Sequence, residues 1–216
     1  MAKMKMWKRL VLLLAVSLVG TGCLVKDDLA TWYLEPGGAL AWSVMEKDVH
    51  SDAEGANDRQ IEEANYIAGV RALNHAMARG FSALGAADAR TRILRGTAPF
   101  TVVTEARFAS IALMGNEIIQ RTGLSGTSTL SRGEAGTTWT FSVRDPHAPD
   151  GVDKPDDDLS ALTGSLEGLV VVLTEGRFVS AEGFQVSGDR RTATMTRWDD
   201  DPLKDDGVLL LKLTWR

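Results

Sequence analysis

The sequence predicts an α+β fold, in which a mainly antiparallel sheet carries one long and one shorter helix packed on it. Three observations lead to this prediction. Short segments with an apolar residue at every second position recur along the chain, as in half-buried strands. Two other segments repeat apolar residues at spacings of three and four, as in amphipathic helices. Glycine and proline clusters separate the segments where hairpin turns would be needed.

The first hairpin is predicted from residues 31–35 and 39–45, which flank Pro36, Gly37 and Gly38. Proline fixes φ at the first central position of a turn, and glycine accepts a positive φ at the second. Pro36 and Gly37 therefore predict a type II turn. In the second strand of this hairpin the side chains that alternate onto one face are Leu40, Trp42 and Val44.

The long helix is predicted over Ile61 to Leu84. A capping box formed by Ser51 and Glu54 would start it early, and Asn57 or Asp58 would start it later. Its largely apolar stripe consists of Ile67, Val70, Asn74, Met77, Phe81 and Leu84. We expect this stripe to cover the sheet, with packing on a partner or on lipid as the alternative.

The remaining segments follow the same two patterns. The shorter helix is predicted at 109–121 and ends at Gly123, a residue suited to a left-handed cap. We expect Leu169 to Leu173 to be a central strand, because it is a continuous apolar run, and 208–215 to be a terminal strand paired in the sheet. Further strands are predicted at 89–94, 100–108, 125–131, 137–143, around Phe178, Phe184 and Val186, and at 192–198.

Two acidic segments interrupt these patterns. Residues 145–158 contain six aspartates and three prolines, and form either a solvated loop or a linker between two halves of the domain. Residues 199–206 form a second acidic turn. Aspartate oxygens are suitable calcium ligands, but neither segment has the spacing of a calcium-binding loop, so we expect no metal site.

Residues 102–110 and 171–180 share the pattern Thr-Glu-x-Arg-Phe-x-Ser once a one-residue insertion is allowed. Duplication of a half-domain would produce such an echo. Coincidence between strand-forming segments would produce it too, and we favour coincidence because the residues that follow the two copies differ.

The N-terminus has the pattern of an export signal. Lys3, Lys5, Lys8 and Arg9 precede an apolar run from Leu10 to Val19. A membrane-spanning helix needs roughly 20 apolar residues, so this shorter run indicates a signal peptide. The small residues Gly20, Thr21 and Gly22 then lead directly to Cys23, the one cysteine of the sequence.

This arrangement resembles the lipobox of bacterial lipoproteins, although Gly20 stands where leucine is usual. The resemblance implies cleavage between Gly22 and Cys23 by signal peptidase II and a lipid (palmitate-type acyl groups) on Cys23. Acylation would also remove the liability of an unpaired thiol in an oxidising compartment. The residue after the cysteine is Leu24, and in this it resembles lipoproteins that are sorted onward. If the host has two membranes, the resemblance implies that the protein is anchored in the outer membrane and faces the periplasm.

Beyond the signal, the segments Cys23-Leu-Val-Lys and Tyr33-Leu-Glu-Pro-x-Gly38 and the Trp42 strand resemble uncharacterised bacterial lipoproteins. The likeness implies export to the cell envelope and carries no catalytic or ligand-binding residues. We accordingly expect residues 1–22 to be the signal peptide, 23–28 a tether and 29–216 a single α+β domain.

Charge and composition exclude several classes of partner. Residues 1–22 carry four basic and no acidic residues, so their removal changes the formal net charge from −5 to −9. An acidic surface argues against nucleic acid as a partner and against electrostatic adhesion to anionic lipid. With one cysteine the chain forms no internal disulfide, so the fold must depend on its apolar core.

No catalytic motif is found in the sequence: a zincin, phosphate-loop or dinucleotide signature is absent. Gly80 to Gly85 falls one residue short of a nucleophile elbow and lies at a helix end, so we expect Ser82 not to be a nucleophile. His50, His75 and His147 are scattered, and we expect His75 on the helix surface. We predict no enzyme activity and no cofactor.

The leading hypothesis is a non-catalytic lipoprotein, held at the membrane through the lipid on Cys23 and acting through contacts with envelope proteins. The alternative is a binder of lipid or a small hydrophobic ligand, with its pocket between the Ile61–Leu84 helix and the sheet. A hydrolase is the least favoured hypothesis.

Overall fold

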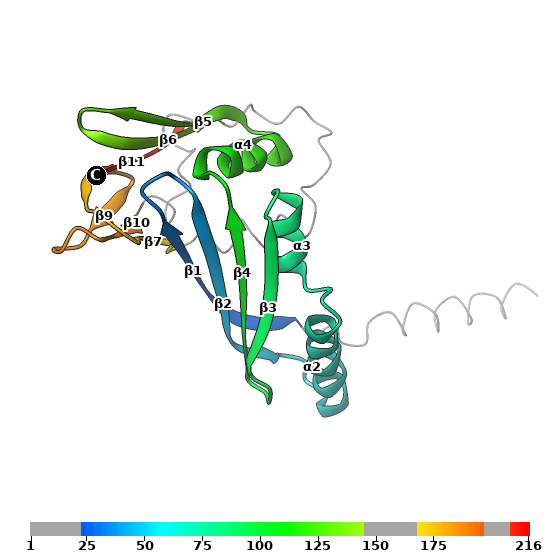
Figure 1. Ribbon diagram of the computed structural model, residues 1–216. Coiled ribbons are helices and arrows are strands. Elements are labelled where there is room, and N and C mark those ends of the chain that lie inside the picture. Colours follow the sequence, from blue (N-terminus) through cyan, green and yellow to red (C-terminus); the bar gives the residue numbers. More distant parts are fainter. Residues whose placement is uncertain (1–22, 145–167, 197–207) are drawn as a thin grey trace, which may run out of the picture.

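The computed structural model describes residues 23–144, 168–196 and 208–216, and it confirms the α+β fold class. One sheet has seven strands in the order β3-β4-β2-β1-β7-β10-β9, and the other has four in the order β5-β6-β11-β8 (Figure 1). The pairing of β1 with β7 is parallel, and every other described pairing is antiparallel. The elements are β1 (Leu24–Leu34), β2 (Leu40–Ser51), α2 (Ala56–Arg71), α3 (Ala76–Ala83), β3 (Asp88–Arg95), β4 (Phe100–Phe108), α4 (Ile111–Thr122), β5 (Ser125–Gly133), β6 (Gly136–Arg144), β7 (Val170–Leu173), β8 (Phe178–Glu182), β9 (Phe184–Val186), β10 (Thr192–Met195) and β11 (Val208–Trp215).

The hairpin of β1 and β2 is present, but its turn differs from the prediction. The Gly38 amide donates to the Glu35 carbonyl at 2.9 Å, which closes a turn around Pro36 and Gly37. The positive φ, 89°, belongs to Gly38, and Gly37 is not in the left-handed region. A type II turn is therefore wrong. The arrangement is that of a turn followed by a left-handed glycine, which matches the twist of the two strands.

The predicted long helix consists of two helices, α2 and α3. Residues 72–75 separate them, and within this break Leu73 has a φ of 56°. The apolar stripe continues across the break, because Ile67, Val70, Met77, Phe81 and Leu84 are all buried. Neither predicted start is correct: α2 begins at Ala56 with Gly55 as its N-cap, and Ser51 is the last residue of β2.

The shorter helix and the later strands follow the predictions closely. Ser110 caps α4 by accepting a hydrogen bond from the Ala112 amide, and Gly123 ends the helix in the left-handed conformation. β7 lies inside the larger sheet, between β1 and β10, and β11 is paired on both sides. The echo segments adopt different structures, because 104–108 belongs to β4 whereas 174–177 joins β7 to β8.

The main core lies between the two sheets. Trp32 of β1 meets Trp42 of β2 and Trp139 of β6 edge to face, with ring centroids 5.4 and 5.8 Å apart. Trp42 also packs on Phe81 of α3 at 5.0 Å. These ring pairs add to the gain from burying large apolar surfaces, so the core is dense enough to hold the fold without a disulfide.

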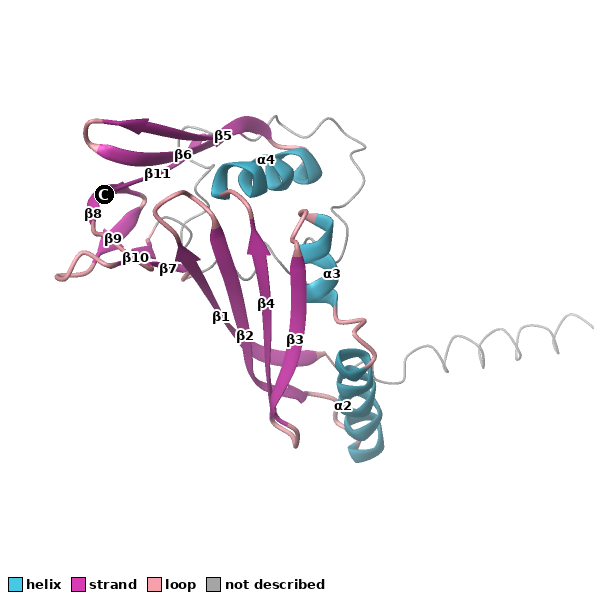
Figure 2. Cartoon of the chain, in the orientation of Figure 1, coloured by secondary structure: helices cyan, strands magenta, loops and turns pink. Residues whose placement is uncertain are grey.

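Among the described residues, the larger sheet has one covered face and one face that we call open. The covered face carries Trp32, Trp42 and Ala106 and packs against α3, α4 and the smaller sheet. A second, smaller core cluster of Val49, Ile67 and Phe100 holds α2 to the same face. No described helix covers the opposite face, and Figure 2 shows α2 and α3 together on one side of β3.

The hairpin of β1 and β2 gives the molecule two ends. We call the end with Cys23, the last residues of β2 and α2 the anchor end, and the end with the Pro36 turn and α4 the distal end (Figure 1). The ten steps from Leu24 to Leu34 at about 3.3 Å each separate the two ends by at most about 33 Å, because β1 bends near its start.

Candidate functional site

Cys23 is an exposed free thiol at the start of the described chain. Its amide donates to Oδ1 of Asp52 at 2.5 Å, and its carbonyl accepts from the Asp52 amide at 3.1 Å. β1 begins at the next residue, Leu24, which pairs with Ser51. The tether expected at 23–28 is therefore wrong: residues 24–28 belong to the sheet, because they pair with the end of β2, which extends six residues beyond the predicted strand.

Between the two core clusters lies a set of polar side chains that we call the ionic cluster: Lys26, Asp28, Glu46, Tyr66 and His75. Oε2 of Glu46 lies 2.9 Å from Nε2 of His75, and the Tyr66 hydroxyl donates to the same oxygen at 3.3 Å. Lys26 Nζ donates to Oε1 of Glu46 at 2.5 Å and lies 3.1 Å from Asp28. Strands β1 and β2, helix α2 and the N-cap of α3 thus meet on one carboxylate.

The electrostatics of this cluster centre on Glu46, which is 2% exposed. Burial alone would raise the pKa of Glu46, but the hydrogen bond and charge of His75, followed by Lys26, hold it below its ordinary value. Burial raises the pKa of Asp28, and Lys26 offsets this only in part. Burial also raises the pKa of Tyr66, with a further contribution from the negative charge of Glu46. Burial would lower the pKa of Lys26, but Glu46 and Asp28 together raise it.

A paired glutamate and histidine beside a tyrosine resemble an acid–base site in composition. The two hollows described below are lined by other residues, and within the cluster Lys26 and Asp28 keep 27% and 21% of their side chains exposed. Oδ1 of Asp28 and Nδ1 of His75 are buried and accept or donate no hydrogen bond within the described residues. Through His75 and Tyr66, the cluster attaches the residues around the break between α2 and α3 to strand β2.

The structure corrects the prediction for His75. It is 7% exposed, not on the helix surface, because the helix breaks before it and the residue caps α3 with its ring turned to Glu46. The sequence pattern contained a signal for this cluster. Glu46 continues the inward alternation of Leu40, Trp42 and Val44, and a carboxylate at such a position requires buried partners.

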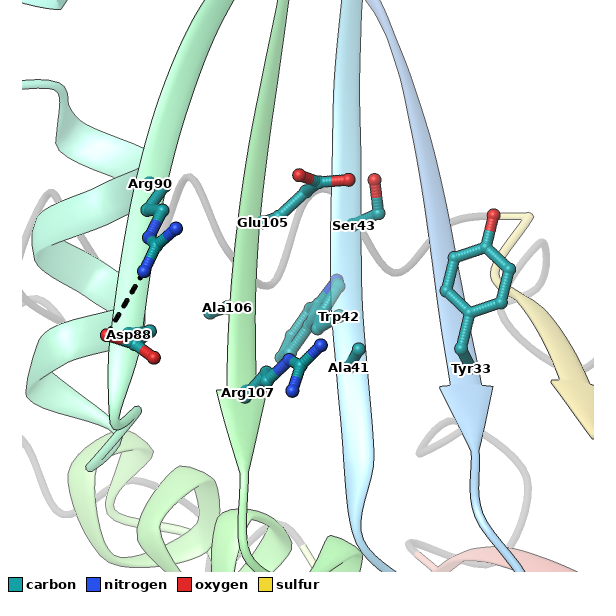
Figure 3. Close-up of a pocket in the computed structure, with 9 residues that line it drawn as sticks. All are labelled: Tyr33, Ala41, Trp42, Ser43, Asp88, Arg90, Glu105, Ala106 and Arg107. Atoms are coloured by element: carbon teal, nitrogen blue, oxygen red, sulfur yellow. Dashed lines mark ion pairs between the residues drawn. The ribbon is translucent and has the colours of Figure 1, made fainter. Parts of the chain in front are cut away.

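The open face of the larger sheet carries a hollow of about 390 Å³ near the distal end. Figure 3 shows Tyr33, Ser43, Glu105 and Arg107, which line it from three neighbouring strands, with Trp42 behind the sheet. The register explains this set. Tyr33, Ala41 and Arg107 occupy neighbouring positions on β1, β2 and β4, and Asp88 of β3 completes the row. The complete lining is Tyr33, Ala41, Trp42, Ser43, Asp88, Arg90, Glu105, Ala106 and Arg107.

Arg107 differs from the other charged residues of this face. Arg92 pairs with Glu105 at 3.1 Å, and Arg90 lies 3.8 Å from Asp88. The Arg107 guanidinium has no ion pair or hydrogen bond among the described residues. It also lines an adjoining hollow of about 330 Å³ with Tyr33 and Ala41. A free guanidinium beside an exposed tyrosine is suited to a carboxylate next to an apolar group.

The other predicted candidates are not brought together. Ser82 lies on α3, where its hydroxyl donates to the Ala78 carbonyl at 3.0 Å. His50 is exposed on β2 and bonds the Asp48 carbonyl through Nδ1 at 2.6 Å. His147 and the acidic segments 145–158 and 199–206 lie outside the described residues. Within the described part of the chain, no group of histidine, cysteine or acidic residues is arranged to hold a metal ion.

The contact between the helices and the sheet is filled by side chains. Met77, Phe81 and Leu84 are each at most 2% exposed beneath α3. A hydrophobic ligand in the position expected for the alternative hypothesis would have to displace these core residues. None of the described helices is both long and apolar enough to cross a membrane.

No protein-family model and no curated protein matches the chain. Among solved structures, the chain is similar to the folded domain of LppM from Mycobacterium tuberculosis, determined by NMR. The TM-score is 0.35 at 10% sequence identity, and the match covers 88% of this chain and 89% of that one.

Proposed function

We propose that this chain is a lipid-anchored lipoprotein of the cell envelope whose domain has no catalytic activity and binds a protein partner through the open face of its larger sheet. Cys23 is the attachment point, and Tyr33 and Arg107 are the central contacts. The observation that carries the proposal is the hollow around Arg107 at the end away from the anchor, where the described residues neither pair with this cation nor place a helix over the sheet face.

The chemistry of the hollow indicates the kind of surface that it fits. Tyrosine and arginine supply large contact areas and are over-represented where interfaces bind most strongly. Tyr33 is 44% exposed, and Ala41 beside it leaves room for an apolar side chain. The partner would place a carboxylate on Arg107 and an apolar residue against Tyr33.

The anchor is tested by Cys23→Ser in the full-length chain. We expect the variant to incorporate no fatty acid and to accumulate with residues 1–22 attached, because the sulfur that receives the lipid is missing. Metabolic labelling with a palmitate analogue and mass spectrometry of the N-terminus provide the readout. Unchanged processing and membrane fractionation would exclude Cys23 as the attachment point.

The partner surface is tested with a photo-crosslinking residue at Tyr33 in cells of the source species. A matched control carries the same residue at Leu113, which is 64% exposed on α4. We expect a defined adduct from position 33 and none from position 113. Arg107→Glu should remove that adduct without altering acylation, because it places a negative charge where the partner's carboxylate binds. Equal adducts at both positions, or an adduct insensitive to Arg107→Glu, would refute this surface.

A further inference from the structure

No linker separates Cys23 from the described folded domain, because β1 begins at the next residue. Cys23 is already paired to Asp52 through its amide and its carbonyl, and Leu24 is the first residue of β1. A lipid on the Cys23 sulfur would be inserted in the membrane one residue away from the sheet. The sheet end at this point is therefore held against the bilayer, rather than at the end of a flexible linker.

The strand register gathers other segments at the same end. Val25 pairs with His50 of β2, and the neighbouring Val49 pairs with Phe100 of β4. The adjoining pair of β4 with β3 is Thr101 with Arg95, so the β3–β4 turn lies in the same row (Figure 1). From β1 to β3 there are three strand spacings of about 4.8 Å, so this end is about 14 Å wide across the sheet.

Large apolar side chains are exposed at this end. Leu24 is 38% exposed, Val25 44% and Leu94, beside the β3–β4 turn, 53%. Arg95 is exposed next to Leu94. The three side chains share this end of the sheet, with Leu24 and Val25 on opposite faces of β1. Exposed apolar residues at one end indicate a contact there, and a cationic residue beside them is suited to the headgroup layer of a bilayer.

We propose that the surface formed by Leu24, Val25 and Leu94, which we call the membrane-facing surface, rests on the lipid headgroup layer of the membrane that holds Cys23. This inference rests on the proposed lipid anchor. The occupant is lipid because Cys23, the residue directly before Leu24, carries the acyl chains that enter this membrane. The contact directs β1 and β2 away from the bilayer, so the hollow around Arg107 is presented at most about 33 Å from it.

The test uses the acylated full-length protein in vesicles of phosphatidylethanolamine and phosphatidylglycerol. Because acylation consumes the one native thiol, a single introduced cysteine can be labelled alone with an environment-sensitive fluorophore. The probe is placed by Leu94→Cys, and the matched control by Leu113→Cys at the distal end. With nitroxide-bearing lipids, we expect the probe at 94 to lose most of its fluorescence and the probe at 113 to lose almost none.

The outcomes separate this inference from the anchor. Weak quenching at both positions, while mass spectrometry still shows acyl chains on Cys23, overturns the membrane-facing surface and leaves the anchor standing. A protein without acyl chains refutes the anchor, and the inference falls with it.

A second variant tests the apolar contact itself. Leu24→Asp with Val25→Asp should reduce the quenching of the probe at 94, because charged side chains resist burial at the interface. Leu29→Asp, at an exposed position of the open face, is the matched control and should leave it unchanged. Quenching that is unaffected by the double variant would overturn the role of these side chains.

Discussion

The two ends of the β1–β2 hairpin are stabilised in different ways. At the distal end, Trp32, Trp42 and Trp139 form part of a large core shared by two sheets and two helices. At the anchor end the apolar cluster is reduced to Val49, Ile67 and Phe100, and the ionic cluster lies beside it. The anchor end therefore depends on charges and on pH, whereas the distal end depends on buried area.

The two ends also differ in what lies beneath their exposed surfaces. The end that we place at the membrane has little core, because α2 is its one described covering element, and Glu46 with its partners attaches the helices there. The end that we assign to the protein partner has a rigid core beneath its hollow, with Trp42 directly behind it. A rigid support keeps a binding surface in one geometry.

The largest expected effect comes from the distal core. Trp42→Ala should lower the free energy of unfolding by about 4–5 kcal/mol, because it removes a fully buried ring with three aromatic neighbours. Phe100→Ala at the anchor end should cost about 3 kcal/mol, because its cluster is small. Urea unfolding followed by circular dichroism measures both. An equal loss for the two variants would remove the distinction between the ends.

The second effect concerns the ionic cluster. Glu46→Gln should lower the free energy of unfolding by about 2–3 kcal/mol, because it leaves the buried His75 and the partly buried Lys26 without their shared carboxylate. Because Asp28 still pairs with Lys26, the loss of free energy should be smaller than for a buried charge left with no partner. Glu105→Gln, which breaks an exposed pair with Arg92, should cost less than about 1 kcal/mol and serves as the control.

The stabilising effect of Glu46 should also depend on pH. Its folded pKa is below the ordinary value of 4.5, so its contribution is complete above that value and is lost as the pH falls through the folded pKa. The difference in unfolding free energy between the wild type and Glu46→Gln should shrink in this acidic range. Asp28, with a raised pKa, acts in the opposite direction, because its protonation on acidification relieves the cost of a buried charge. A difference that is constant from neutral to strongly acidic pH would contradict this assignment.

The smallest effect compares one glycine from each end. An added Cβ at Gly115 of α4 would lie 2.7 Å from Cβ of Ser128, so Gly115→Ala should cost about 1–2 kcal/mol. At Gly69 of α2 nothing lies within 4 Å, so Gly69→Ala should add about 0.5–1 kcal/mol through helix propensity. Thermal unfolding of the two variants should thus shift in opposite directions. Stabilisation by both would mean that α4 packs less closely than its contact with Ser128 implies.

Much of the fold could be predicted from local patterns. β4 was predicted at its observed bounds, because Phe100 follows a proline and Phe108 precedes the Ser110 cap. The break between α2 and α3 could not be predicted, because Ala72 and Leu73 are good helix formers and the apolar stripe continues through them. There the tertiary pairing of His75 with Glu46 prevails over local propensity.

The candidate site was predicted only in part. Cys23 stood out because it is a single residue in a recognisable context. The ionic cluster draws on residues 26, 28, 46, 66 and 75, which no local motif connects. The hollow around Arg107 depends on the register of four strands, and each of its residues taken alone looks like an ordinary exposed position on a strand.

Local sequence patterns predict the α+β class, most strands and Cys23 as the residue that meets the membrane. These features depend on neighbours in the chain: alternation, caps and a short apolar run. Long-range packing places residues 24–28 in the sheet, gathers five polar residues around the buried Glu46, and leaves Arg107 without a partner among the described residues. Each of these depends on which strands pair and in what register, a choice made by packing between residues far apart in the chain.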